Sequence, residues 1–265
     1  MDQVGVLSEA SIRDRLDVGR VGRVMRMLPE TTSTNDEALA AVGDASADGL
    51  VVFAEHQTAG RGRLGRHWVA PRGASLLCTA LVFLDDDPAW QCRTTLIGAL
   101  ATCEAARTGG ADTAEIKWPN DVVVGEKKVG GVLVESRAGG PSSRAYAIGV
   151  GINCLQQPGH WPEDLRDRAT SLEIESAHAV DRAAVARTLL TVFDRWFATP
   201  RTWDDEALKQ AWLHRARPLG ARVRLLCDRR EFTGSVIDID PSAGLIVELD
   251  GGGRRHFDPA RTAVL

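Results

Sequence analysis

Strand-like and helix-like segments follow one another irregularly through the first 216 residues of this 265-residue chain, and that pattern most constrains its fold. Apolar runs typical of buried strands occupy residues 50–55, 75–84, 115–118, 122–124, 128–136 and 144–154. Apolar residues at helical spacing predict helices over residues 33–42, 91–107, 181–197 and 206–216. Because no strict β-α-β repetition is present, the sequence predicts an α+β fold with helices packed on a mixed sheet.

A different pattern begins after Pro218. Residues 219–265 hold no long helical stretch, and their short alternating apolar runs are separated by turns, of which residues 250–253 are a hairpin signal. Four or five short strands in a piece of about 47 residues predict a small β-barrel. We therefore expect two domains, over residues 1–217 and 218–265.

The composition argues against several classes of protein. Hydrophobic residues make up 44% of the chain and charged residues 26%, which is typical of globular proteins and unlike disordered chains. No stretch approaches the roughly 20 apolar residues of a membrane-spanning helix, and residues 1–28 lack the apolar core of a secretory signal. The net charge of −4 argues against non-specific attraction to nucleic acid. Five cysteines without a Cys-x-x-Cys pair indicate free thiols, so we expect a cytoplasmic protein.

The segment from Gly60 to Trp68 reads Gly-Arg-Gly-Arg-Leu-Gly-Arg-His-Trp and is the most informative part of the chain. Four arginines and no acidic residue fall between His56 and Leu84, which indicates a local anion site in an acidic protein. The glycines leave backbone N–H groups open to a ligand, and arginine supplies planar paired donors for phosphate or carboxylate. The pattern favours a phosphate-bearing small ligand. A solvated basic loop and an RNA-binding loop are the alternatives.

Two further segments place polar side chains at strand ends. In Lys117-Trp118-Pro119-Asn120-Asp121 a strand ends and turns, which suits a nucleotide phosphate or Mg²⁺ but is also common in plain hairpins. The pair Lys127-Lys128 opens an apolar strand, so at most one of the two lysines can face a pocket. Two exposed turn lysines are the alternative, although Gly130-Gly131 would let a ligand lie against the backbone.

Two polar segments complete the set. Within residues 31–37, Thr34-x-x-Glu37 predicts a capping box, and the surplus of hydroxyl and amide groups could hydrogen-bond a neutral polar ligand. Residues 149–153, Gly-Val-Gly-Ile-Asn, predict a buried strand that contains two glycines and ends at Asn153.

Taken together and in this order, the five segments resemble the biotin protein ligases. That family shares Gly-Arg-Gly-Arg-x-Gly-Arg-x-Trp, Lys-Trp-Pro-Asn-Asp, Lys-x-Gly/Ala-Gly, Gly-x-Gly-x-Asn and Thr-Ser-Thr-Asn, found here at residues 60–68, 117–121, 128–131, 149–153 and 32–35. The resemblance covers most of residues 31–172. It implies a catalytic domain similar to class II aminoacyl-tRNA synthetase cores, followed by a small SH3-like C-terminal domain.

The resemblance implies a two-step reaction. Biotin and ATP with Mg²⁺ form biotinyl-5′-AMP, and the biotinyl group then passes to a lysine of the biotin carboxyl carrier domain of an acetyl-CoA or other acyl-CoA carboxylase. No tightly bound prosthetic group, membrane or DNA partner is expected. Many bacterial members carry a DNA-binding domain of some 60 residues before the catalytic domain; only 30 residues precede Thr31, so we infer no repressor role.

The resemblance also implies roles for individual residues. The expected biotin contacts are Ser33, Thr34, Asn35, Gln57, Arg61, Gly62, Arg63, Lys128 and Gly131. The expected nucleotide contacts are Arg66, Trp68, Lys117, Asn120 and Asn153. Lys128, Arg63 and Arg66 are the expected catalytic residues, and Asp121 is the candidate Mg²⁺ ligand. Residues 155–169, where the family has an adenine-side loop, show no clear match.

Three other functions compete with this interpretation. A lipoate ligase would share the core and the lysine, but the complete arginine loop with Trp68 favours biotin. A nucleic-acid-binding module would use the arginine loop, against which the acidic net charge weighs. A non-catalytic biotin sensor would not need Lys128 and Arg66.

Overall fold

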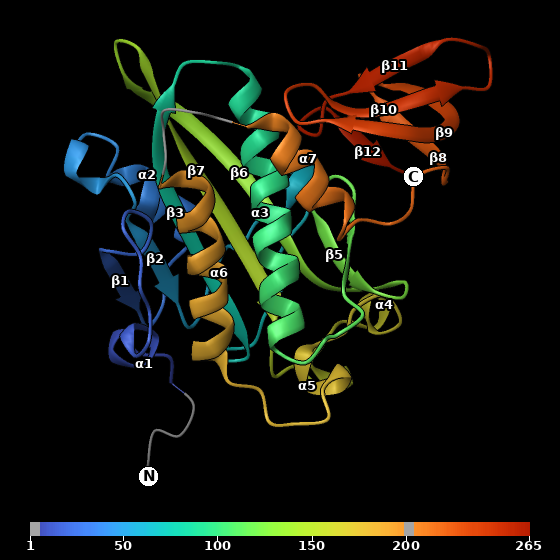
Figure 1. The fold of residues 1–265 in the computed structure, drawn as a ribbon. Coiled ribbons are helices and arrows are strands. Elements are labelled where there is room, and N and C mark those ends of the chain that lie inside the picture. The colour runs from blue at the N-terminus through green and yellow to red at the C-terminus, as the bar shows by residue number, and fades with distance from the viewer. Residues whose placement is uncertain (1–5, 199–203) are drawn as a thin grey trace.

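The computed structural model describes residues 6–198 and 204–265 and contains two β-sheets (Figure 1). The larger sheet has the strand order β1-β2-β3-β7-β6-β5-β4, in which β1 and β2 are parallel and all other neighbours are antiparallel. Its strands are β1 (Met25–Leu28), β2 (Val51–Ala54), β3 (Ser75–Asp85), β4 (Glu115–Lys117), β5 (Asp121–Val124), β6 (Lys127–Gly140) and β7 (Ser143–Asn153).

Helices cover both faces of this sheet. The α-helices are α1 (Glu9–Arg13), α2 (Thr34–Ala40), α3 (Ala89–Thr108), α4 (Glu163–Arg166), α5 (Leu172–Glu175), α6 (Arg182–Phe197) and α7 (Asp205–Leu213), with short 3₁₀ turns η1 (Ala45–Ala47), η2 (Arg63–Gly65) and η3 (Pro158–His160). The long helices α3 and α6 pack together on one face, and α2 packs on the other (Figure 1). Strand residues alternate accordingly: Val51 and Phe53 belong to the main core, whereas Val52 and Leu81 pack with α2. None of the helices in the described ranges is long and apolar enough to span a membrane.

The second sheet lies at one end of the first, beside α7 (Figure 1). Its five antiparallel strands are β8 (Arg222–Cys227), β9 (Arg230–Asp240), β10 (Gly244–Leu249), β11 (Arg254–Phe257) and β12 (Thr262–Val264), in the order β11-β10-β9-β8-β12. An ion pair between Lys209 of α7 and Asp238 of β9, with N···O at 2.5 Å, joins it to the rest of the chain. The predicted hairpin at residues 250–253 is confirmed.

The predicted fold class, α+β with a mixed sheet followed by a small β-unit, is confirmed. Each predicted strand and helix is present, with ends shifted by a few residues. The sequence analysis missed α1, α4, α5 and β1, which have four or five residues each. Such short elements carry too little periodicity to stand out from loops.

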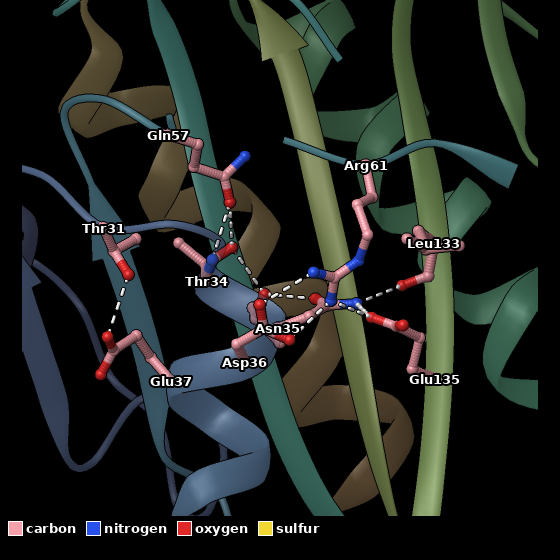
Figure 2. Close-up of polar contacts among 10 residues, drawn as sticks. Thr31, Thr34, Asn35, Asp36, Glu37, Gln57, Arg61, Leu133 and Glu135 are labelled. Carbon is pink, nitrogen blue, oxygen red and sulfur yellow. Dashed lines mark hydrogen bonds and ion pairs between the residues drawn. The ribbon is translucent and has the colours of Figure 1, made fainter. Parts of the chain in front are cut away.

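The capping box predicted at Thr34 and Glu37 is wrong. Ser33 is the residue that caps α2, and its side chain makes no capping hydrogen bond. Instead, Gln57 Oε1 accepts the backbone N–H of Thr34 at 2.7 Å, which satisfies a free donor of the first helical turn (Figure 2). The carboxylate of Glu37 accepts the hydroxyl hydrogen of Thr31 at 2.9 Å (Figure 2).

Candidate active site

A cavity of about 740 Å³ lies on the face of the large sheet that carries α2. Strands β3, β6 and β7 form its floor, and the N-terminal end of α2, the 60–69 loop and the end of the C-terminal sheet form its walls. All fifteen residues predicted for the site line this one cavity: Ser33, Thr34, Asn35, Gln57, Arg61, Gly62, Arg63, Arg66, Trp68, Lys117, Asn120, Asp121, Lys128, Gly131 and Asn153. The fold thus brings together five segments that are far apart in the sequence.

The N-terminal end of α2 meets the arginine loop through a network of charged hydrogen bonds (Figure 2). Arg61 donates to both carboxylate oxygens of Asp36 at 2.7 and 2.8 Å, and to Glu135 at 3.0 Å. The hydrogen bond from Arg61 holds the pKa of Asp36 below its usual range, and the same bond raises the pKa of Arg61. Asn35 donates to Glu135 at 2.6 Å and to the carbonyl of Leu133 at 3.3 Å. Arg61 is therefore a compensated, fixed part of the wall (Figure 2).

The glycines of the 149–153 segment give the floor its shape. A Cβ at Gly149 would lie 2.3 Å from Asn35 Oδ1, and one at Gly151 would lie 2.6 Å from the ring of Trp68. Both distances are too short for any side chain, so only glycine lets Asn35 and Trp68 lie directly on β7. The motif is thus explained by packing of two site residues that come from other segments.

Lys128 faces the cavity, while Lys127 is exposed, which confirms that only one of the pair can point inward. The ammonium group donates to Asp121 at 2.5 Å and lies 5.6 Å from the centre of the Trp68 ring. Two backbone hydrogen bonds hold Lys128 in place. Its N–H donates to the Arg168 carbonyl at 2.8 Å, and its own carbonyl accepts the Thr170 N–H at 2.9 Å. These two hydrogen bonds fix the backbone position from which the Lys128 side chain extends into the cavity.

Arg63 connects the loop to the C-terminal sheet. Its guanidinium donates to Asn120 Oδ1 at 2.8 Å, to the Thr262 carbonyl at 2.7 Å and to the Pro259 carbonyl. Burial lowers the pKa of Arg63, but an arginine side chain stays protonated in proteins. A charged donor is therefore held at the edge of the cavity by neutral oxygens.

The lining side chains give the cavity an excess of positive charge. The cationic ones are Arg61, Arg63, Arg66, Arg168, Lys117 and Lys128, and the acidic ones are Asp121, Glu126 and Asp164. An anion is favoured in such a site, although the whole chain is acidic.

Several lining residues were not predicted from the sequence. Trp161 is buried and Arg168 is exposed, and both come from the 155–169 segment that matches no motif. Residues 263–265 line the cavity from the C-terminal sheet. Asn153 was predicted as a nucleotide contact; its oxygen accepts from Gln156 at 3.0 Å and its amide donates to the Thr170 carbonyl at 2.9 Å. These bonds tie the end of β7 to the segment behind Lys128.

Asp121 is the carboxylate that the sequence offers as a ligand for a divalent cation. Within residues 6–198 and 204–265, no cluster of three or more His, Cys, Asp or Glu side chains could hold a metal ion. Asp121 lies in the cavity but is paired with Lys128. Mg²⁺ commonly uses one or two carboxylates together with substrate phosphates, so Asp121 suits a Mg²⁺ ion that arrives with a nucleotide.

Comparison with known proteins identifies the family. The Biotin/lipoate A/B protein ligase family model matches residues 27–153. A biotin–[acetyl-CoA-carboxylase] ligase of Paracoccus denitrificans is 35% identical over 237 residues, which cover 88% of this chain and 97% of that protein. Its counterpart in Mycobacterium tuberculosis is 36% identical over 257 residues, covering 94% of this chain and 91% of the other.

Solved structures show the same fold. A biotin protein ligase variant from Aquifex aeolicus in complex with biotin matches with a TM-score of 0.72 and 25% sequence identity. The match covers 92% of this chain and 98% of that one, so it includes both sheets. This chain belongs to the biotin/lipoate A/B protein ligase family, and within it to the biotin protein ligases.

Proposed function

We propose that this chain is an ATP-dependent biotin protein ligase. The carboxylate oxygen of biotin attacks the α-phosphorus of ATP, the bond to the bridging oxygen breaks, and pyrophosphate leaves. The amine of a carrier lysine then attacks the biotinyl carbonyl, AMP leaves, and the amine loses a proton. The observation that carries the proposal is the convergence of all fifteen predicted residues on one positively charged cavity.

The charges of the cavity suit the first step. A carboxylate and an α-phosphate that approach to 4 Å repel each other by about 4 kcal/mol at an effective dielectric constant of 20. Lys128, Arg63 and Arg66 line the same cavity and supply cationic donors that offset this repulsion. Their effect is larger in the transition state, where negative charge builds up on the phosphate oxygens. No covalent protein nucleophile is needed, because positioning and electrostatics suffice.

The cavity offers two chemically different ends. Hydroxyl and amide side chains at the start of α2, together with Gln57, suit the neutral, polar ureido ring of biotin. Ser33, Thr34, Asn35, Gln57, Arg61, Gly62, Arg63, Lys128 and Gly131 are the proposed biotin side. Arg66, Trp68, Lys117, Asn120 and Asn153 are the proposed nucleotide side, to which we add Trp161 and Arg168.

Mg²⁺ is part of the proposal. Asp121 would hold the ion together with the nucleotide, once its ion pair with Lys128 opens. A bound Mg²⁺ supplies charge neutralisation of the phosphates. Lys128 would then be free to donate to the biotin carboxylate. No tightly bound prosthetic group is included.

Three further statements belong to the same proposal. The partner is the biotin carboxyl carrier domain of an acetyl-CoA or related carboxylase, as the ligase reaction requires. The domain boundary at residues 217/218 is supported by the separate second sheet, which starts at Arg222. A cytoplasmic location is supported by the five cysteines, which are free and buried.

One experiment tests the function directly. The protein is incubated with MgATP, biotin and a carrier domain, and the carrier is examined for the added mass of one biotinyl group on one lysine. In parallel, ATP–pyrophosphate exchange is measured with biotin and with lipoate. Exchange that is stimulated by lipoate and not by biotin would contradict the proposal in favour of a lipoate ligase.

A further inference from the structure

Thr79 lies in the middle of β3, behind the hydroxyl and amide side chains of the site, and belongs to none of the five sequence segments described above. It is fully buried, on the strand face that also carries Leu77 and Leu81. It does not line the cavity, but its hydroxyl lies 2.8 Å from Thr34 Oγ1 and 2.6 Å from Asn35 Oδ1. Both of those residues do line the cavity and are themselves buried.

Four oxygens form a continuous row of hydrogen-bond contacts, which we call the oxygen row. It runs from Gln57 Oε1 to Thr34 Oγ1 at 2.9 Å, on to Thr79 Oγ1 at 2.8 Å, and ends at Asn35 Oδ1 at 2.6 Å. Both ends are amide oxygens, which only accept hydrogen bonds, and each of the two hydroxyls in the middle has one hydrogen. Two hydrogens therefore serve three contacts.

Neither end of the oxygen row can reverse to remove this shortage. Gln57 Oε1 also accepts the backbone N–H of Thr34 at 2.7 Å, so a rotated amide would place donors against a donor (Figure 2). The Asn35 amide nitrogen donates to Leu133 and Glu135, so a rotated Asn35 would place its oxygen against two other oxygens (Figure 2). The row is fixed with an acceptor at each end.

We propose that Thr79 is a positioning residue: its oxygen gives the Thr34 hydroxyl a second acceptor, so that Gln57 Oε1 can accept a hydrogen bond from the substrate instead. A ring N–H that reaches Gln57 Oε1 would replace the Thr34 hydroxyl there. The Thr34 hydrogen can then turn to Thr79 Oγ1 while Thr79 donates to Asn35 Oδ1, so that both hydroxyl hydrogens and both amide oxygens of the row have a partner. This inference rests on the proposed function and adds the reason for ligand choice: the cyclic urea of biotin has two N–H donors, whereas the dithiolane ring of lipoate has none.

The test uses direct binding to the whole protein by titration calorimetry. The ligands are biotin and a carbocyclic analogue in which both ring N–H groups are replaced by CH₂. Thr79→Val removes the hydroxyl at nearly constant volume, and Thr79→Ser keeps it. Because Thr79→Val leaves the Thr34 hydroxyl without an acceptor once the ring N–H occupies Gln57 Oε1, we expect it to raise the Kd for biotin about 10- to 100-fold. The analogue should bind within about threefold of its wild-type Kd, and Thr79→Ser should keep the wild-type preference for biotin.

A matched control separates positioning from general damage. Thr94 in α3 is also fully buried, and its hydroxyl donates to the Trp90 carbonyl at 2.6 Å on its own helix. Thr94→Val makes the same chemical change outside the site and should leave both Kd values unchanged. If Thr79→Val does not fold, Thr79→Ala removes the same hydroxyl with less steric risk and is measured in its place.

The outcomes are distinct. A wild-type Kd for biotin in Thr79→Val, or an equal loss of biotin and analogue binding, would overturn the inference and leave the proposed function standing. A wild-type protein that neither binds biotin nor shows biotin-dependent pyrophosphate exchange would overturn both.

Discussion

Gly131 and Gly130 are neighbours on β6 that face opposite sides, and the structure predicts opposite consequences when each becomes alanine. A Cβ at Gly131 would lie 2.8 Å from both Cε and Nζ of Lys128. A Cβ at Gly130 would lie 2.8 Å from Thr102 Cγ2 and 3.2 Å from the Gly151 carbonyl oxygen, in the core under α3. The first clash displaces the lysine proposed to be catalytic, and the second strains the packing.

The size of the Gly131→Ala effect follows from how far Lys128 must move. To reach an ordinary contact of 3.4–4 Å from 2.8 Å, the lysine tip has to withdraw by about 0.6–1.2 Å. For a charge about 4 Å from the phosphate at an effective dielectric constant of 20, a shift of about 1 Å removes close to 1 kcal/mol. Loss of a hydrogen bond to a charged group adds about 1.5–3 kcal/mol. The sum, about 2–4 kcal/mol, corresponds to a rate of adenylation lowered about 30- to 1,000-fold.

The stability of the Gly131→Ala protein should change little. The Lys128 side chain is 35% exposed and long, so its end can move at a cost within about 0.5 kcal/mol. Gly130→Ala should instead lower the free energy of unfolding by about 1–3 kcal/mol, because it overfills a packed core. At temperatures where it is folded, its adenylation rate should stay near that of the wild type.

The assays are biotin-dependent ATP–pyrophosphate exchange and urea unfolding, on both variants and on Lys128→Ala. Lys128→Ala removes the ammonium altogether, so it sets the lower limit of the rate and should keep the fold intact. The reasoning is refuted if Gly131→Ala exchanges pyrophosphate at the wild-type rate, or if it loses as much stability as Gly130→Ala. Near-normal exchange by Lys128→Ala would remove the role assigned to that lysine.

Three more predictions concern the arginine loop and its partners. Arg63→Ala should weaken retention of the adenylate at least tenfold more than ATP binding, because Arg63 belongs to the proposed biotin side, which the adenylate occupies and ATP alone does not. Dialysis of labelled ligands measures both, and equal losses would contradict the prediction. Between its anchored ends the arginine loop is exposed at residues 64–67, so biotin with MgATP should slow its cleavage by trypsin several-fold, and unchanged cleavage would count against closure over the adenylate. The hydrogen bond from Arg61 lowers the pKa of Asp36 from 3.8, so its stabilising effect is present above that pH and is lost as the pH falls. The difference in unfolding free energy between wild type and Asp36→Asn should therefore shrink between pH 6 and pH 3, and a constant difference would contradict it.

The parts of the fold that the sequence predicted are those that depend on local signals. The helix at 181–197 has a continuous apolar face, and the strand at 75–84 is almost wholly apolar, so periodicity and composition identify both. The prediction of how α2 is capped was wrong because the actual acceptor, Gln57, lies 23 residues away and comes close only through the tertiary fold. Local residue patterns contain no information about such a partner.

The same distinction separates the predicted and unpredicted parts of the site. Fifteen of the residues that line the cavity were predicted, because their motifs could be compared with a family. The partners that hold them were not: Arg61 is fixed by Asp36 and Glu135, and Arg63 by carbonyls of the C-terminal sheet. Every residue of a chain has a carbonyl oxygen, so the sequence does not indicate which carbonyl an arginine will contact.

Glycines that look like part of a ligand-binding motif can instead be required for packing between segments, as Gly131, Gly149 and Gly151 show. Gly149 and Gly151 were predicted only as parts of a strand, and Gly131 as a place where a ligand lies against the backbone. In the structure each leaves room for a functional side chain from elsewhere: Asn35 over Gly149, Trp68 over Gly151, and the site lysine over Gly131. A small residue on the floor of a sheet therefore sets where larger neighbours can lie, and those neighbours meet the ligand. Substitution at such a glycine is expected to act on binding through the displaced side chain, which is why the two adjacent glycines of β6 separate catalysis from stability so clearly.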